Sequence, residues 1–420
     1  MKPLARVIFR FLARHILKRY QPIVIGVAGS VGKTSTKEAI AAALADGQRT
    51  VRKTEGSFNA EIGVPVTIIT GGAARTSPWA WFGVMVTGIR LLAQTRPYPR
   101  VLVLEMGSDK PGDLADLLGV ATPTVGVLTS MAPEHLEFFG DESSVIEEES
   151  LIVRTLSSQA QAVINVDDER SRIIMPKVKA RVISYGWHES ATVRADTMTI
   201  TNDERGLPTG MILKVVVEGS TIPIALPGVI GRHQVLPILG AIATTLAIGD
   251  RVAQVLPRLS GYRPPRGRMR LFEGRDASKL IDDSYNASPE AVQAALETMF
   301  ELHVPGKKYA ILGQMSELGA SADEWHDRIG GMIGPKSLHQ LVTVGPLAKR
   351  YGDAAIAVGF PATHVINVAD AEAAATHILP QLGPGDLVLV KGSRYASRLE
   401  RAVRILLAHP DRDAKELVGG

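Results

Sequence analysis

A glycine-rich turn between an apolar run and a polar helix start constrains the fold of this chain more than any other segment. The apolar run covers residues 23–27, and the turn reads GSVGKTS at residues 29–35. β-branched apolar residues favour a buried strand, and such a turn directs backbone N–H groups and a helix N-terminus at one spot. The segment therefore predicts an α/β fold with a phosphate site at the end of its first strand.

The residues of this turn have separate expected roles. The longer pattern G-x-x-x-x-G-K-[S/T] is incomplete because Val27 replaces its first glycine, but the shorter G-x-x-G-K-T remains. In such a loop Lys33 reaches the outer phosphates, and the hydroxyl of Thr34 binds Mg²⁺. The alternative is a strand–helix turn that binds no ligand. The predicted nucleotide-binding residues of the turn are Gly29, Ser30, Gly32, Lys33, Thr34 and Ser35.

Composition limits the classes of protein that remain. The chain has 420 residues, 45% of them hydrophobic, which is enough for two or three domains with full cores. It contains no cysteine, which excludes disulfides, thiolate metal sites and cysteine nucleophiles. A net charge of only +4 and 5% aromatic residues do not favour nucleic acid as a partner.

Residues 1–22 are predicted to form a basic amphipathic helix. Apolar side chains between residues 4 and 17 share one face, beside a basic stripe at four-residue spacing. Such a helix can lie on an anionic membrane through residues 1–19, and the alternative is a helix packed on the first domain. Residues 79–92 are apolar but too short and interrupted to span a bilayer, so they are expected to be interfacial or buried. The basic stripe consists of Arg6, Arg10, Arg14 and Lys18.

Short apolar runs alternate with helical stretches from residue 23 onward. This alternation is typical of βαβ units with a parallel sheet. Residues 178–225 are richer in strand signals, which predicts a small sheet inserted in the first domain. The Pro- and Gly-rich residues 261–267 predict a linker, after which a Rossmann-like α/β domain begins. The expected domains are a P-loop domain at residues 23–262 and a C-terminal domain at residues 263–420.

Two further residues lie where predicted strands end. Glu105 closes the run that begins at residue 101, and His135 follows the run at residues 124–128. The carboxyl ends of parallel strands form the ligand-binding edge of such sheets, so Glu105 is a candidate ligand for a nucleotide-bound magnesium ion. Taken alone, Glu105 could equally be a surface glutamate and His135 a structural histidine.

Ordered motifs across most of the chain resemble the Mur ligase family. Within the family, the chain is most similar to the MurF type, which adds D-alanyl-D-alanine to a UDP-muramoyl tripeptide. Each motif is weak alone, but their joint order is specific, and the run DDSYNASP points to the MurF branch. The motifs are GSVGKT at 29–34, NAEIGVP at 59–65, EMG at 105–107, HLE at 135–137, GRH at 231–233, GR at 267–268, DDSYNASP at 282–289, ELG at 317–319 with His326, and KGSR at 391–394.

This resemblance implies an ATP-dependent ligase with ATP bound by both domains. Such enzymes convert a carboxylate to an acyl phosphate, which an amine attacks to give an amide, ADP and phosphate. Cations are needed because carboxylate and phosphates repel each other. The implied catalytic residues are Lys33, His135, Glu149 and Arg268. The implied Mg²⁺ ligands are Thr34, Glu105, His135 and Glu149. Further implied ATP contacts are Asn59, Arg268, Asn286 and Gln314.

Three residues depart from the family pattern, and one of them, Gln234 in place of a common asparagine, is expected to be neutral. Most relatives carry a carbamylated lysine in the helix after the histidine, whereas this chain has Glu149 there. A carboxylate presents the same pair of anionic oxygens as a carbamate, so Glu149 is expected to bind the second magnesium ion, and the alternative is a solvated acidic run. Gln314 stands where an aspartate is usual, which removes a charge from a ribose contact.

The strand before the glycine-rich turn starts at residue 23, which predicts that the N-terminal UDP-binding domain of MurF enzymes is missing. A partner protein would then recognise the UDP-sugar, or the substrate would differ. The expected partners are a peptidoglycan-precursor peptide and D-alanyl-D-alanine, in the cytoplasm or at the inner face of the membrane. Two alternatives stay open, a ligase for another amino-acid or lipid-linked substrate of the folylpolyglutamate or cyanophycin kind, and a non-catalytic ATP-binding regulatory protein. The expected substrate-binding residues are His233, Lys391, Ser393 and Arg394.

Overall fold

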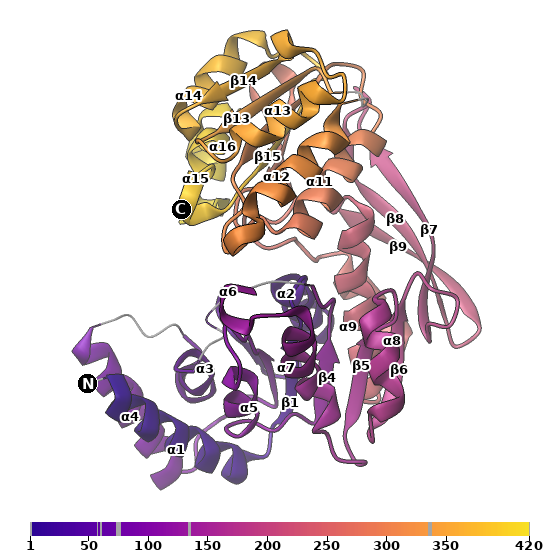
Figure 1. Ribbon diagram of the computed structural model, residues 1–420. Helices are drawn as coiled ribbons and strands as arrows, with labels where there is room; N and C mark the ends of the chain where they lie inside the picture. The colour runs from indigo at the N-terminus through magenta and orange to yellow at the C-terminus, as the bar shows by residue number, and fades with distance from the viewer. Residues whose placement is uncertain are drawn as a thin grey trace. The chain divides into compact units, whose positions relative to one another are not determined.

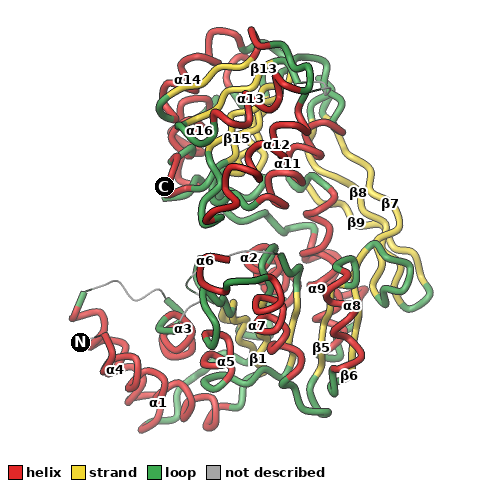
Figure 2. The backbone as a smooth tube through the Cα atoms, in the orientation of Figure 1, coloured by secondary structure: helices red, strands yellow, loops and turns green. Residues whose placement is uncertain are grey.

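The computed structural model describes residues 2–56, 58, 61–72, 77–132, 136–334 and 338–419. The chain divides into two compact α/β units (Figure 1). Unit 1 comprises Met1–Thr197, Leu213–Ile224 and Val235–Tyr262, and unit 2 comprises Met198–Ile212, Ala225–Gln234 and Arg263–Gly420. In each unit, helices flank the strands of a sheet (Figure 2).

In the described residues, nine strands form the first sheet in the order β2-β3-β1-β4-β5-β6-β7-β8-β9. β1 pairs in parallel with β3 and β4, and parallel pairing continues from β4 through β5 and β6 to β7. All five residues of β3 are buried, as expected for a parallel strand covered on both faces. The strands are β1 Ile23–Ala28, β2 Val51–Lys53, β3 Val101–Glu105, β4 Val125–Leu128, β5 Gln161–Asn165, β6 Arg181–Gly186, β7 Val193–Asn202, β8 Pro208–Val217 and β9 Ser220–Pro227.

Alternate residues of the central strand enter different cores. Val24 and Ala28 of β1 belong to a buried cluster that also holds residues of α1, α3, α4, α5 and α7. Ile25 and Val27 are buried on the opposite face, because successive strand side chains point to opposite sides. The helices are α1 Lys2–Tyr20, α2 Lys33–Leu44, α3 Gly63–Thr70, α4 Pro78–Ala93, α5 Asp113–Leu118, α6 Leu136–Phe139, α7 Glu142–Arg154, α8 Glu169–Ile174, α9 Val235–Ala247 and α10 Val252–Leu259.

Unit 2 contains a sheet in the order β10-β11-β15-β12-β13-β14, in which β10 is antiparallel to β11 and the other pairs are parallel. Ile281 and Leu389 face a core with α11, α12 and α13, whereas Leu280 and Val388 face a second core with α14 and α16. The sheet is therefore doubly wound. The elements are β10 Arg270–Glu273, β11 Lys279–Asp283, α11 Pro289–Glu301, β12 Lys308–Gly313, α12 Ala322–Ile333, β13 Gln340–Val344, α13 Lys349–Ala357, β14 Val365–Val368, α14 Ala371–Ile378, β15 Leu387–Lys391, α15 Arg394–Ser397, α16 Glu400–Leu406 and α17 Pro410–Asp413.

The predicted α/β fold is confirmed, with one difference in the β-rich segment. This segment is not a detached sheet, because β7 pairs with β6 at Tyr185–Val193 and Gly186–Arg194 and thereby extends the first sheet. Short 3-10 turns connect several elements. They are Met175–Lys177, Arg232–Gln234, Arg275–Ala277, Gly319–Ser321, Ala362–His364, Leu379–Gln381 and Ala414–Glu416.

The basic N-terminal helix α1 packs onto unit 1. Phe9, Leu12 and Ile16 are buried in its core, and the ring of Phe9 lies 6.1 Å from that of Trp81 on α4. Gly88 of α4 allows this close approach, because a Cβ atom there would lie 2.8 Å from Leu12. The alternative of a helix packed on the first domain is therefore confirmed for one face of α1.

The predicted basic stripe of α1 binds within the protein. Arg6 and Arg10 both donate to the carboxylate of Asp116 on α5, at 2.7 and 3.1 Å. Arg14 donates to the carbonyl oxygen of Gly119, which caps the C-terminus of α5, at 2.7 Å. Cations are favoured at a helix C-terminus, so these arginines fix α1 against α5.

Candidate active site

The turn after β1 adopts backbone angles that suit glycine. Gly29 has a φ of 127° and Gly32 a φ of 92°. A Cβ atom on Gly29 would lie 2.2 Å from the hydroxyl oxygen of Thr129, so the turn also passes too close to the loop after β4 to carry a side chain. α2 begins at Lys33 directly after this turn, and its first backbone N–H groups have no partner within the helix. The turn and the helix start therefore have the backbone geometry that suits an anion.

Lys33 folds back over this turn. Its Nζ donates to the carbonyl oxygens of Gly29 and Ser30, the latter at 2.8 Å. Carbonyl oxygens orient the ammonium group without neutralising its charge. The half-buried Lys33 therefore holds a positive charge at the turn, where a phosphate oxygen would form a charge-assisted bond.

A buried group of three side chains lies beside the turn. The Thr34 hydroxyl donates to Oε1 of Glu105 at 3.1 Å, and Oε2 of the same carboxylate lies 3.2 Å from Nζ of Lys37. Glu105 ends β3, next to Val27 of β1 in the parallel register. Sequence reasoning paired Thr34 with Glu105 but missed Lys37, although its position four residues after Lys33 puts it on the same side of α2.

Thr34 and Glu105 fit a magnesium ion. Their hydroxyl and carboxylate oxygens are the hard donors that Mg²⁺ takes, and they converge within 3.1 Å at the start of α2. In the part of the chain that the structure describes, no group of three or more His, Asp or Glu side chains could hold a metal ion. Mg²⁺ in such sites keeps several waters and substrate oxygens as ligands, so two protein ligands suffice.

Glu149 contacts the turn from α7. Its Oε2 accepts a hydrogen bond from the Ser30 hydroxyl at 2.8 Å. The adjacent Glu148 accepts the backbone N–H groups of Gly112 and Leu114, at 3.0 and 2.7 Å, and so caps the N-terminus of α5. Both carboxylates are buried, and only Glu147 of the run is exposed. The alternative of a solvated acidic run is therefore wrong for Glu148 and Glu149.

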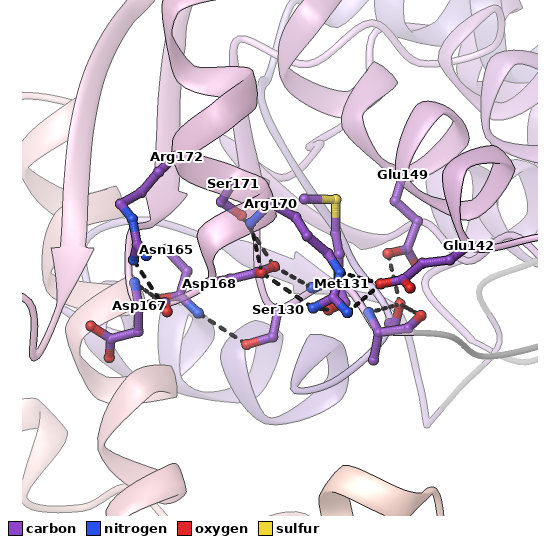
Figure 3. Close-up of polar contacts among 12 residues, drawn as sticks. Ser130, Met131, Glu142, Glu149, Asn165, Asp167, Asp168, Arg170, Ser171 and Arg172 are labelled. Carbon is purple, nitrogen blue, oxygen red and sulfur yellow. Dashed lines mark hydrogen bonds and ion pairs between the residues drawn. The ribbon is translucent and has the colours of Figure 1, made fainter.

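A polar network fixes the loop after β4 (Figure 3). Oδ2 of Asp168 accepts the backbone N–H of Met131 at 2.8 Å, and Arg170 donates to the Met131 carbonyl oxygen at 3.2 Å. The amide nitrogen of Asn165 donates to the Ser130 hydroxyl at 2.9 Å. These contacts hold the loop just before the predicted His135. His135 and Asn59 lie outside the described residues, so their roles stay predictions.

Several residues predicted from the C-terminal motifs lie together in unit 2. Nζ of Lys391 lies 2.6 Å from Oδ2 of Asp283 and 3.1 Å from the carbonyl oxygen of Asn286. The Ser393 hydroxyl donates to Oδ1 of Asn286 at 3.3 Å, and the Ser393 N–H donates to the Gln314 carbonyl oxygen at 3.1 Å. Asn286 itself is exposed, so a ligand can reach its amide.

Burial sets the charge states in this part of unit 2. Burial lowers the pKa of Lys391, although the carboxylate of Asp283 opposes that change. Burial also lowers the pKa of the His233 imidazole to about 4, so His233 is neutral at physiological pH. The pKa of Asp282 is raised to about 6, mainly by burial. Lys391 is thus enclosed and paired, which does not support the predicted direct contact with substrate.

The remaining predicted residues of unit 2 fall into two groups. The Arg268 guanidinium lies 4.6 Å from the centre of the Tyr285 ring, and Nε of Arg394 lies 3.9 Å from the Glu400 carboxylate. Both arginines are half-buried and so remain accessible to an anion. His326 is buried, and its Nε2 accepts the backbone N–H of Met315 at 3.0 Å, which is a structural role.

The fold and the glycine turn define an α/β protein in which a glycine-rich turn of the P-loop kind joins the first strand to the next helix. Residues 86–245 match the Mur ligase middle domain, and residues 267–394 match the Mur ligase, glutamate ligase domain. The chain belongs to the Mur ligase family.

Two relatives and one solved structure of the MurF type illustrate the similarity. Over 391 residues the chain is 31% identical to the UDP-N-acetylmuramoyl-tripeptide--D-alanyl-D-alanine ligase of Mycobacterium tuberculosis, covering 89% of this chain and 71% of the relative. It is 27% identical to the enzyme of the same name from Bacillus subtilis, over 95% of this chain and 79% of that one. The crystal structure of MurF ligase from Thermotoga maritima in complex with ADP superimposes with a TM-score of 0.78 and 28% identity, over 94% of this chain and 82% of that one.

Proposed function

We propose that this protein is an ATP-dependent ligase that joins D-alanyl-D-alanine to a carboxylate of a peptidoglycan-precursor peptide and releases ADP and phosphate. The names of relatives at 27–31% identity describe this ligase activity, and a similar structure was solved with ADP. The group formed by Thr34, Glu105 and Lys37 carries the proposal, because hydroxyl and carboxylate oxygens converge there at a phosphate-binding helix start.

The residues of unit 1 support transfer of the γ-phosphoryl group of ATP. A magnesium ion held by Thr34 and Glu105 would supply the positive charge that the phosphates need. Lys33 would exchange its loop carbonyl acceptors for phosphate oxygens, and Lys37 would hold the Glu105 carboxylate in place through their ion pair. The peptide carboxylate attacks the γ-phosphorus and ADP leaves. The amine of D-alanyl-D-alanine then attacks the acyl carbon, and phosphate leaves as the amine loses its proton.

Other residues receive proposed roles according to their surroundings. Glu149 would add a buried negative charge for a second cation beside the turn. In unit 2, we assign ATP contacts to Asn286, Gln314 and Arg268. Lys391 is instead a positioning residue, because it is paired with Asp283 and bonded to the Asn286 carbonyl. His135 and Asn59 keep their predicted roles, and the proposed substrate contacts are His233, Ser393 and Arg394.

Mass spectrometry tests the reaction most directly. The protein would be incubated with Mg-ATP, UDP-muramoyl tripeptide and D-alanyl-D-alanine, with each component omitted in turn. A product heavier by one condensed dipeptide, formed only in the complete mixture together with ADP, is the expected result. ATP hydrolysis without such a product would contradict the assigned substrates, and donors of the folylpolyglutamate type or lipid-linked peptides would then be assayed.

The role of Glu149 has a separate test. Glu149→Gln keeps a hydrogen-bond acceptor for the Ser30 hydroxyl but removes the negative charge. We expect the Mg²⁺ concentration for half-maximal activity to rise about tenfold and kcat to fall by a similar factor. The matched control is Glu147→Gln, because Glu147 is exposed on the same helix. Unchanged magnesium dependence in the Glu149 variant would refute a metal-binding role.

A further inference from the structure

The helices α1 and α4 expose many apolar side chains. Among the described residues, twelve large hydrophobic side chains are exposed, and six of them lie on these two helices. Trp79 is 82% exposed, and the other five are between 51% and 67% exposed. The remaining six are scattered over other elements. The six, which we call the outer apolar face, are Leu4, Val7 and Phe11 of α1 and Trp79, Phe82 and Ile89 of α4.

The outer apolar face lies on one side of unit 1. Leu4, Val7 and Phe11 are three and four residues apart, so they form one stripe along α1. The exposed residues of α4 follow at similar spacing. The two helices lie side by side in Figures 1 and 2, with Phe9 of α1 against Trp81 of α4. Both helices bury their opposite sides in the same core cluster, so their exposed stripes point away from it together.

The charged side chains of α1 and α4 themselves are all positive. Neither α1 nor α4 contains an aspartate or glutamate. Lys18 is exposed and continues the stripe seven residues after Phe11, and Arg90 is exposed on α4. Arg14 and Arg19 donate to the carbonyl oxygens of Gly119 and Leu92, which does not neutralise their charges. The surface therefore combines apolar side chains with uncompensated cations.

We propose that the outer apolar face of α1 and α4 docks on the surface of a bilayer that contains anionic lipid. Apolar and tryptophan side chains enter the headgroup boundary of a bilayer, while nearby lysine and arginine attract anionic headgroups. In the described residues, no helix is long and apolar enough to cross a membrane, so this contact is peripheral. A second copy of the chain fits less well, because face-to-face association would oppose Lys18 and Arg90 with further cations.

This surface differs from the membrane contact predicted from residues 1–19 alone. The predicted basic stripe contributes little to the outer apolar face, because Arg6 and Arg10 are paired with Asp116. Half of the outer apolar face comes from α4 instead. Deletion of residues 1–19 would also remove Phe9, Leu12 and Ile16 from the core, so point variants are the cleaner test.

Sedimentation with vesicles tests the proposal on the full chain. One vesicle set contains phosphatidylcholine alone, and the other contains about 30% phosphatidylglycerol. We expect binding to the anionic vesicles that weakens about tenfold without anionic lipid or at high salt. The double variant Phe11→Glu/Phe82→Glu is expected to bind anionic vesicles at least about tenfold more weakly. Ile173→Glu is the matched control, because Ile173 is exposed on α8 outside this face and should leave binding unchanged.

Two further measurements keep the result unambiguous. The variants alter exposed residues outside the proposed active site, so their thermal unfolding and their ligase activity on soluble substrates should match the wild type. The vesicle assay contains no ATP or peptide, so it can succeed or fail independently of the proposed function. Equal binding by the double variant and the wild type would overturn the proposal. So would a light-scattering mass of a dimer that the double variant reduces to a monomer, which would identify a second copy as the occupant.

Discussion

Both units bury a lysine beside a carboxylate where parallel strands end. In unit 1, Lys37 lies 3.2 Å from Glu105, and in unit 2, Lys391 lies 2.6 Å from Asp283. Glu105 also accepts the hydroxyl of Thr34 at the start of α2. Asp283 instead accepts the backbone N–H of Met269, and Lys391 donates to a backbone carbonyl oxygen. The first pair therefore also contacts the helix start of the proposed phosphate site, whereas the second pair forms its further hydrogen bonds with backbone groups.

This difference shows what a buried ion pair can indicate. The desolvation of two charges offsets much of their attraction, so neither pair by itself marks a functional site. The two pairs differ in the third group that bonds the carboxylate, which is the Thr34 hydroxyl for Glu105 and the Met269 N–H for Asp283. A hydroxyl beside a phosphate-binding turn can exchange a hydrogen bond for a metal ion, whereas a backbone group in a loop only fixes the loop.

The largest expected effect concerns the cation at the turn. Lys33→Met should lower kcat/KM by about 10³-fold, because the positive charge that meets the phosphates is lost. The thermal midpoint should change little, since Lys33 is only half-buried and its ammonium group bonds two loop carbonyl oxygens without an ion pair in the described residues. Lys53→Met, which alters a surface lysine paired with Glu38, serves as the control for a lost charge. Retained activity in the Lys33 variant would refute the proposed contact between Lys33 and the phosphates of ATP.

Changing the Lys391–Asp283 pair of unit 2 should lower the free energy of unfolding before it affects activity. Lys391→Met leaves Asp283 buried without its cation, and we expect a loss of about 3 kcal/mol in the free energy of unfolding, measured with urea. Adding Asp283→Asn to this variant should recover part of the loss, because the uncompensated charge disappears. A Lys391 variant as stable as the wild type but inactive would show that this lysine contacts substrate after all.

A third effect depends on pH. The raised pKa of about 6 for Asp282 means that the folded state retains a proton between pH 4 and 6 that the unfolded chain has lost. Asp282 therefore makes the free energy of unfolding fall by about 2 kcal/mol as pH rises through this window. His233, with a pKa lowered to about 4, acts in the opposite direction, since the unfolded chain binds its proton first as pH falls.

Asp282→Asn separates these opposing contributions. Urea unfolding at pH 4, 5, 6 and 7 should give a stability that rises more steeply with pH in the variant than in the wild type, because the opposing contribution of Asp282 is removed while that of His233 remains. The wild type should show a flatter profile. Parallel profiles in the two proteins would refute the raised pKa of Asp282.

The smallest expected effect sharpens the role of Asn286. Ser393→Ala removes the hydroxyl that donates to the Asn286 side chain at 3.3 Å. The free energy of unfolding should change by less than about 1 kcal/mol, because the bond is long and Asn286 is exposed. The KM for ATP should nevertheless rise about threefold if Asn286 orients the nucleotide. An unchanged KM would argue against that assignment.

The sequence predicted the elements that have strong local signals. The strand at residues 101–105 and the helix that starts beside Lys33 both appear, because apolar runs and glycine turns act over a few residues. The convergence of Thr34 and Glu105 followed from one general rule, that parallel strands end at a common edge. Lys37 and Asp283 were missed because their roles depend on pairing between separate segments.

The N-terminal helix marks another limit of sequence reasoning. Its periodicity predicted one apolar face, yet Phe9 and Leu12 are buried while Val7 and Phe11 are exposed. Periodicity gives the positions of apolar residues around a helix but not the neighbours that cover them. Here α3 and α4 cover one side only. The burial of each residue therefore required the tertiary structure.

The division of the chain between its units also bears on how it emerges from the ribosome. Met198–Ile212 and Ala225–Gln234 belong to unit 2, although unit 1 ends later, at Tyr262. Ile230 is buried in the same core cluster as Met269 and Leu389, so it leaves the ribosome long before the last strand of that core. The apolar segment around Ile230 therefore stays exposed on the nascent chain until synthesis is nearly finished, and chaperones can bind it during that time. For the same reason a fragment starting at residue 263 lacks part of its own core.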